Sequence, residues 1–149
     1  MKGIEIKQKI ERFPILKLHF KGIFAIDTIP RLNITNFAIV NTSHSGTKGL
    51  HWIVVYLSPF RILEVFDSSG IHFEVISSAL KRHNPYNIIH NILPYQKLGT
   101  KNCGIFCIYF ILNRILNLEV NFYDLLDKIF SSNLELNDGK IKDFKKWLG

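Results

Sequence analysis

The stretch that decides the fold is Gln96-Lys-Leu-Gly-Thr-Lys-Asn-Cys-Gly-Ile-Phe-Cys107. It is a polar, glycine-containing loop that leads into an apolar segment, Ile105 to Leu118, which lacks proline and glycine and has the length of several helical turns. Cys103 therefore falls at or just before the first turn of a helix, where unpaired backbone N–H groups and the helix dipole favour a thiolate over a thiol. Because the thiolate is the nucleophilic form, Cys103 is a candidate catalytic residue.

Two neighbours of Cys103 fit a catalytic interpretation. Gly104 leaves the sulfur sterically open, and the side-chain amide of Gln96 offers an N–H group that could stabilise an oxyanion. A free cysteine is more often a small buried apolar residue, but polar residues such as those preceding Cys103 rarely lead into a core position. Cys107, one helical turn further on, fits the buried role instead.

A catalytic thiolate needs a base, and the sequence offers His51 upstream. Residues 50–57 have a strand-like pattern with His51 at the entrance, and residues 61–66 form a second strand with Asp67 at its exit. If the two strands form a hairpin, His51 and Asp67 become neighbours, and an aspartate beside a histidine fixes its tautomer and stabilises the imidazolium. His44, in the polar loop before the first of these strands, is the weaker alternative as a base.

The order and spacing of these motifs resemble the adenain family, the maturation proteases of adenoviruses, and more distantly the proteases that process SUMO and other ubiquitin-like proteins. The similarity covers most of the chain from Gly22 to Leu112. The motifs that carry it are Phe37-Ala-Ile-Val-Asn-Thr42, His51-Trp52 at a strand start, Asp67 followed shortly by Gly70, and Gln96 seven residues before Cys103-Gly-Ile-Phe-Cys107.

The resemblance implies an α+β fold of the papain-type cysteine protease architecture, with a central mixed or antiparallel sheet and the nucleophile at a helix N-terminus. It implies a triad of Cys103, His51 and Asp67, with Gln96 as an oxyanion donor. The implied function is an endopeptidase that cleaves viral precursor proteins at Gly-Gly or Gly-X sites during virion maturation. Two alternatives stay open: a protease that removes ubiquitin-like modifiers, and an inactive protease-fold protein that binds DNA or acts as a scaffold.

The sequence departs from adenain at two places. Adenain has a glutamate at the position of Asp67, whereas the SUMO proteases, like this chain, have an aspartate. In addition, the segment from His83 to Asn91 has no cysteine to which an activating peptide could be linked. We therefore expect no disulfide-linked activator. Stimulation by DNA or by a non-covalently bound peptide stays open.

Composition narrows the class of protein further. A chain of 149 residues with 47% hydrophobic residues is expected to form one domain, 1–149, with a normal core. The charged N-terminus predicts no secretory signal, and the longest apolar run, residues 105–112, is too short to span a bilayer. Two cysteines on one helix indicate a reduced environment and make a poor metal site. We expect a monomer in the host nucleus, at a site of viral assembly or in the virion, with no metal, organic cofactor or membrane association.

The net charge of +7 suggests that the protein is attracted to a polyanion; the alternative is that the charge serves only to keep the protein soluble. A basic face on the expected last helix is the candidate DNA contact, although a solvated charged face is the default interpretation. This face consists of Lys140, Lys142, Lys145 and Lys146. The partners expected are therefore protein substrates and non-specific DNA.

The remaining expected elements follow from apolar periodicity and from turn residues. They are a helix within Lys2–Phe13, an irregular segment Pro14–Pro30, a strand Asn36–Asn41, a helix Ile71–His83, a strand Asn87–Leu93, a helix after an Asn121 cap, a loop Ser131–Asn137, and a helix Gly139–Leu148 capped by Asp138.

Overall fold

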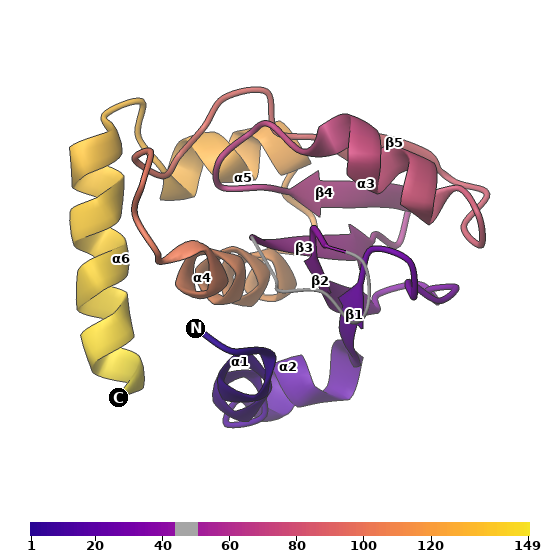
Figure 1. The fold of residues 1–149 in the computed structure, drawn as a ribbon, viewed down its shortest axis with the longest axis horizontal. Coiled ribbons are helices and arrows are strands. Elements are labelled where there is room, and N and C mark those ends of the chain that lie inside the picture. Colours follow the sequence, from indigo (N-terminus) through magenta and orange to yellow (C-terminus); the bar gives the residue numbers. More distant parts are fainter. Residues whose placement is uncertain (44–50) are drawn as a thin grey trace.

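A computed structural model describes residues 1–43 and 51–149, which form a five-stranded sheet and six helices (Figure 1). The strands lie in the order β1-β2-β3-β4-β5. The inner pairs β2/β3 and β3/β4 are antiparallel, and the outer pairs β1/β2 and β4/β5 are parallel. The expected α+β fold with a mixed sheet is therefore confirmed. The strands are β1 Phe20–Ala25, β2 Phe37–Asn41, β3 Trp52–Leu57, β4 Ile62–Phe66 and β5 Asn87–His90.

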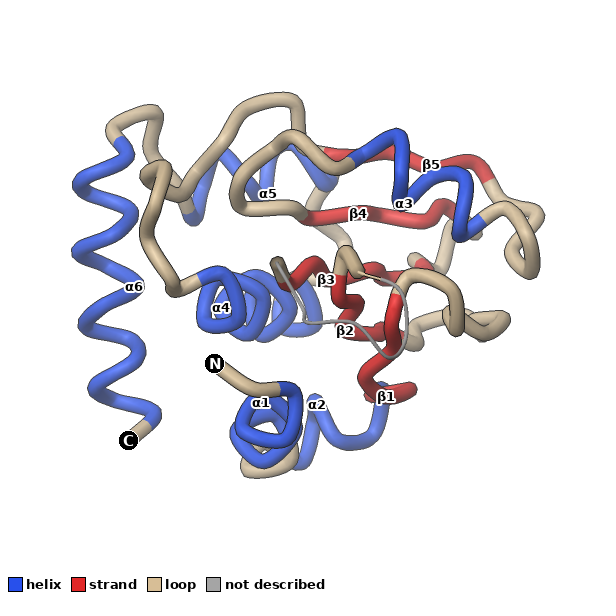
Figure 2. Tube along the Cα trace, in the orientation of Figure 1, coloured by secondary structure: helices blue, strands red, loops and turns tan. Residues whose placement is uncertain are grey.

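Helices cover both faces of the sheet (Figure 2). One face packs on α4, and α1, α2, α5 and α6 pack around α4 in turn. The other face packs on α3. Within the described residues, no helix is long and apolar enough to cross a membrane. The helices are α1 Gly3–Ile10, α2 Pro14–His19, α3 Phe73–Leu80, α4 Cys103–Leu116, α5 Phe122–Ile129 and α6 Leu134–Leu148.

Alternation along the strands divides the core into two layers. On β3, Val54 and Tyr56 face the α4 layer, whereas Ile53, Val55 and Leu57 face the α3 layer. Successive side chains of a strand point to opposite faces of its sheet, so a strand covered on both sides must be apolar almost throughout. The continuous apolar runs of β2 and β3 fit this rule.

Two segments differ most from the sequence expectation, and two other elements are shorter than expected: α3 spans Phe73–Leu80 and β5 ends at His90. Pro14–Pro30 is not irregular, because it contains α2 and β1, with Pro14 at a helix start, where its missing N–H costs nothing. The last helix begins at Leu134 rather than Gly139. Asn133 caps it by accepting hydrogen bonds from the next backbone N–H groups, and Asp138 lies inside the helix. Both Asn and Asp are good caps, so packing rather than local sequence decides which one is used.

A buried ion pair joins α4 to the sheet. Arg114 Nε lies 2.7 Å from Glu64 Oε1, and Arg114 Nη2 donates to Glu64 Oε2 at 3.1 Å. The guanidinium also donates to the carbonyl oxygens of Asn117, the C-cap of α4, and of Val120 in the following turn. Burial raises the pKa of Glu64 to about 7, although Arg114 acts in the opposite direction.

We expect Arg114→Met to lower the free energy of unfolding by about 3–5 kcal/mol, because it leaves the Glu64 carboxyl buried without its partner. Adding Glu64→Leu should restore much of this loss, since an apolar pair of similar volume does not need the ion pair. Urea denaturation of the three proteins measures both effects. A double variant as unstable as Arg114→Met alone would contradict the prediction.

Candidate active site

Cys103 is the first residue of α4, as its sequence context predicted. The next residue, Gly104, is buried against α1 and Met1: a Cβ atom there would lie 3.0 Å from Ile6 Cδ1 and 3.4 Å from Met1 Sδ. We expected Gly104 to leave the sulfur open. Its clearest role in the structure is instead to let α1 pack closely against the first turn of α4.

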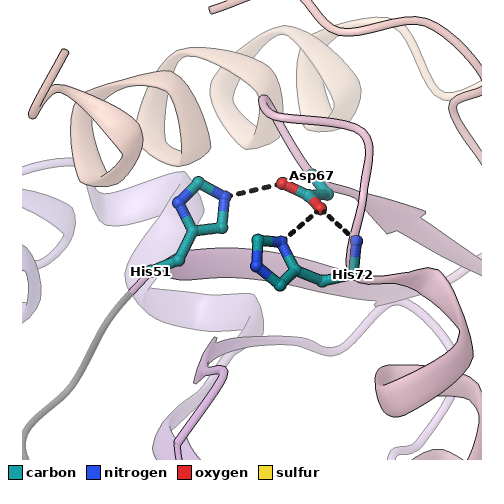
Figure 3. Close-up of side chains that lie close together, drawn as sticks. All are labelled: His51, Asp67 and His72. Carbon is teal, nitrogen blue, oxygen red and sulfur yellow. Dashed lines mark hydrogen bonds and ion pairs between the residues drawn. The ribbon is translucent and has the colours of Figure 1, made fainter. Parts of the chain in front are cut away.

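His51 and Asp67 lie side by side, as the hairpin hypothesis predicted. His51 immediately precedes β3 and Asp67 immediately follows β4, and these two strands are antiparallel neighbours. His51 Nε2 lies 2.6 Å from Asp67 Oδ1 (Figure 3). The alternative base, His44, lies outside the described residues.

The turn that follows β4 holds the Asp67 carboxylate in place. Oδ1 accepts hydrogen bonds from the backbone N–H and the hydroxyl of Ser69, at 2.9 and 2.7 Å. Oδ2 accepts from the backbone N–H groups of Ile71 and His72, at 3.1 and 3.0 Å. The buried side chain of Asn91 bonds both the N–H and the C=O of Asp67, at 2.9 and 2.7 Å. The orientation of this carboxylate is therefore fixed from several directions.

His72 is the residue of this site that the sequence analysis missed. Its Nδ1 lies 2.9 Å from Asp67 Oδ2, and its ring stacks on that of His51 with centroids 4.8 Å apart (Figure 3). The sequence placed His72 inside a helix, but it is the N-cap residue of α3. The only signal was a histidine five residues after a candidate acid.

His51, Asp67 and His72 also place possible metal-ligand atoms within 4.8 Å of one another. A metal ion there would need the carboxylate and imidazole lone pairs. Both oxygens of Asp67 already accept N–H and O–H donors, however. The cluster therefore fits a hydrogen-bonded histidine pair better than a metal centre.

The pKa of Cys103 is lowered and the pKa of His51 is raised, and both shifts favour an ion pair between the two side chains. Burial raises the pKa of the Cys103 thiol, but hydrogen bonds with His51 and with the backbone of Trp52 and Gly104 lower it below its ordinary value. Burial lowers the pKa of His51, but its bonds to Asp67 and Cys103 raise it to about 9. Since Nε2 of His51 faces Asp67, Nδ1 is the nitrogen left for the sulfur. Both shifts favour a thiolate–imidazolium pair over the neutral thiol and imidazole.

Gln96 is buried, and its amide is already engaged. Its Oε1 accepts a hydrogen bond from Ser68 Oγ at 2.5 Å, while its Nε2 donates to the carbonyl and hydroxyl oxygens of Thr100, both at 2.8 Å. The backbone N–H of Gln96 donates to Ser68 O at 3.0 Å, which ties this segment to the turn after β4. An oxyanion would therefore compete with Thr100 for the Gln96 amide.

Cys107 differs sharply from Cys103. It is fully buried, its Sγ donates to the carbonyl oxygen of Trp52 at 3.4 Å, and burial raises its pKa well above the ordinary value. The expectation of a core residue fits these contacts.

Three of the four candidate DNA-binding lysines line a hollow of about 700 Å³, which we call the basic groove. Lys140 does not line it: its Nζ donates to the carbonyl oxygen of Ile129 at 2.8 Å and lies 6.0 Å from the centre of the Tyr109 ring. The walls of the basic groove include Lys9, Lys101, Asn102, Lys142, Lys145 and Lys146.

Comparison with known proteins supports the fold. No family model and no curated protein sequence matches the chain. Among solved structures, the ASFV pS273R protease aligns with a TM-score of 0.55 and 16% identity, over 95% of this chain and 66% of that protein. The central domain of the uncharacterised Lpg1148 protein from Legionella pneumophila aligns over 87% of this chain and 86% of that one with 13% identity, but its TM-score of 0.44 is too low to support an argument. The chain thus shares the fold of a viral protease and spans about two thirds of its length.

We expect iodoacetamide to alkylate Cys103 much faster than Cys107. As the pH is lowered, the rate at Cys103 should fall only at a pH below the pKa of an ordinary thiol. His51→Gln removes the partner that lowers the pKa of Cys103. The pKa of Cys103 should then rise, because burial is no longer offset by His51, and alkylation should slow far more near pH 6.5 than near pH 9.5. Peptide mapping by mass spectrometry over a pH series measures both cysteines. Equal pH profiles in the two proteins would refute the ion pair.

Proposed function

We propose that this protein is a cysteine endopeptidase of the adenain-like kind, in which Cys103 is the nucleophile, His51 the acid and base, and Asp67 the residue that orients His51. The observation that carries this proposal is the Asp67–His51 hydrogen bond beside a cysteine at a helix N-terminus, whose pKa the interaction with His51 lowers. The shared fold with the ASFV pS273R protease supports it.

In this mechanism the Cys103 thiolate attacks the scissile carbonyl carbon, and the C=O bond opens to an oxyanion. The backbone N–H of Cys103 and the Gln96 amide, once released from Thr100, would bind that oxyanion. The imidazolium of His51 then gives its proton to the leaving amine, and the C–N bond breaks to leave a thioester. His51, now neutral, takes a proton from water, which hydrolyses the thioester and releases the thiolate.

We further propose that the substrates are viral precursor proteins cut at Gly-Gly or Gly-X sites during assembly. The fold shared with a viral protease favours this class over ubiquitin-like modifiers, which remain the second candidate. The two candidates separate in one digestion. Purified protein is incubated with candidate viral precursors and with a ubiquitin-like precursor, and mass spectrometry identifies the bonds that are cut.

A graded loss of activity is expected when the proposed catalytic residues are changed. Cys103→Ala and His51→Ala should abolish cleavage, because the first removes the nucleophile and the second the proton carrier. Gln96→Ala should lower kcat by about 100- to 1,000-fold, as for one oxyanion donor. Asp67→Asn should keep part of the activity, since a Cys–His pair can ionise without the third residue.

The measurement is kcat and KM on a peptide that the digestion identifies, with circular dichroism as a control for folding. Full activity of Cys103→Ala would overturn the proposed function. If Asp67→Asn had the kcat and KM of the wild type, Asp67 would have no part in catalysis and would serve only to form the turn after β4.

A DNA-binding role is the second proposed property, and the basic groove is the observation that favours it. Five lysines converge there, and the groove reaches Asn102, the residue before Cys103. Contacts between lysines and phosphates act largely through counterion release, so such binding is independent of sequence and sensitive to salt. DNA held there would also bring the enzyme to substrates packed on the same nucleic acid.

We expect binding to any DNA duplex with a micromolar or tighter Kd at low salt, lost progressively towards ~0.2 M salt. Changing Lys142, Lys145 and Lys146 to Glu should weaken this binding without altering the alkylation of Cys103. The matched control makes the same change in net charge outside the groove, with Lys17, Lys81 and Arg82 changed to Glu. Fluorescence anisotropy with two unrelated duplexes provides the measurement. Equal losses of DNA affinity in the two triple variants would show that the groove lysines act only through the overall charge of the protein.

A further inference from the structure

A second hollow, of about 370 Å³, opens beside the proposed catalytic residues; we call it the side pocket. His51 and Gln96 form the part of its wall nearest to the chemistry. Its volume falls within the range of about 300–1,000 Å³ that is typical of ligand pockets. The apolar part of its wall consists of Ile71, Pro94, Leu98 and Leu134.

Two large apolar residues of the side pocket, Ile71 and Leu98, are highly exposed. Leu98 is 97% exposed and Ile71 is 74% exposed, although both border the same hollow. Single exposed apolar side chains are common, but here they converge on one concavity next to a reactive thiol. Covering such surface with an apolar group removes it from water, which is favourable.

The charge of the pocket rim gives no reason for a charged ligand. Three basic side chains, Lys97, His51 and His72, line the side pocket, and each has an acidic partner. Lys97 Nζ lies 3.0 Å from Glu135 Oε1, and the two histidine rings lie 2.6 and 2.9 Å from the buried Asp67 carboxylate. A substrate side chain that enters therefore meets aliphatic surface and basic side chains that already have acidic partners, a setting that favours an apolar residue over an acidic or basic one.

The position of the side pocket indicates which half of a substrate would use it. In the proposed mechanism the acyl half stays bonded to Cys103, while the amine half receives its proton from His51. His51 is part of the pocket wall, whereas Cys103 is not among the described residues that line it. The pocket is thus placed beside the leaving amine.

We propose that the side pocket selects a large apolar side chain in the residue that directly follows the scissile bond. The inference rests on the proposed function and goes beyond it, because the sequence predicted small residues at the cut without this requirement. In terms of a Gly-X site, the pocket makes X a leucine-, methionine- or phenylalanine-sized residue.

The test is digestion of a synthetic peptide library, randomised on both sides of a central glycine, with cut positions read by mass spectrometry. We expect large apolar residues directly after the cut to be favoured over glycine or aspartate by about 10- to 100-fold in kcat/KM. Cleavage without this preference, or with it only before the cut, overturns the inference and leaves the proposed protease function standing. If no peptide is cut and Cys103 is no more reactive than Cys107, the proposed function fails, and the inference fails with it.

A matched pair of variants links the preference to the pocket. Leu98→Ser should reduce the apolar preference by roughly tenfold, measured as the ratio of kcat/KM between peptides with leucine and with glycine after the cut. Leu18→Ser changes another highly exposed leucine, on α2 and outside the pocket wall, and should leave the preference unchanged. Both variants should alkylate at Cys103 like the wild type, which shows that the active site is intact. If Leu98→Ser keeps the full preference, the side pocket is not the selecting surface.

Discussion

The hydrogen bond between Asp67 and His51 is the interaction on which the rest of the site depends. It joins the end of β4 to the start of β3, so the register of one antiparallel pair sets the distance between acid and base. The turn after Asp67 then reaches the oxyanion side of the site, because Ser68 bonds both the backbone and the amide of Gln96. Gly70 completes this turn in the left-handed region at φ +72°, where a Cβ would lie 3.2 Å from the backbone of Pro94. One turn thus places the orienting acid and the Gln96 segment together.

Burial opposes every charge in this site, and pairing overcomes it. Burial alone would raise the pKa of Asp67 and Cys103 and lower that of His51, so it disfavours the charged form of all three groups. Their mutual hydrogen bonds reverse all three directions. Cys107 shows what happens without such partners: it lies four residues further along the same helix, and burial raises its pKa instead. The reactivity of a cysteine in α4 therefore depends on its distance from His51 and from the start of the helix. At Cys107, one turn further on, neither the imidazole nor the helix N-terminus lowers the pKa of the thiol.

Local sequence was sufficient for the parts of the site that follow from regular structure. A polar loop before an apolar segment predicted the start of α4 at Cys103, and two adjacent apolar runs predicted the hairpin that pairs His51 with Asp67. His72 escaped prediction because its contact with Asp67 depends on how an irregular turn folds back, which has no periodic signal. The early start of α6 escaped for a related reason. Asn137 is buried there and bonds the carbonyl oxygens of Tyr95 and Ser131, so tertiary contacts extend the helix across a segment that reads as a loop.

The loop between Gln96 and Thr100 connects recognition to chemistry in the proposed mechanism. Thr100 holds the Gln96 amide at one end of this loop, while Leu98 in the middle stands exposed at the side pocket. In the proposed mechanism, a substrate residue that covers Leu98 would contact the same short segment in which Thr100 holds the Gln96 amide. Gly99, at φ +83° with open space around its Cβ position, gives this segment a backbone that other residues rarely adopt. Binding energy gained in the side pocket would then help to free the Gln96 amide, two residues before Leu98. Selection of the residue after the cut and stabilisation of the oxyanion would thus depend on one rearrangement of this loop.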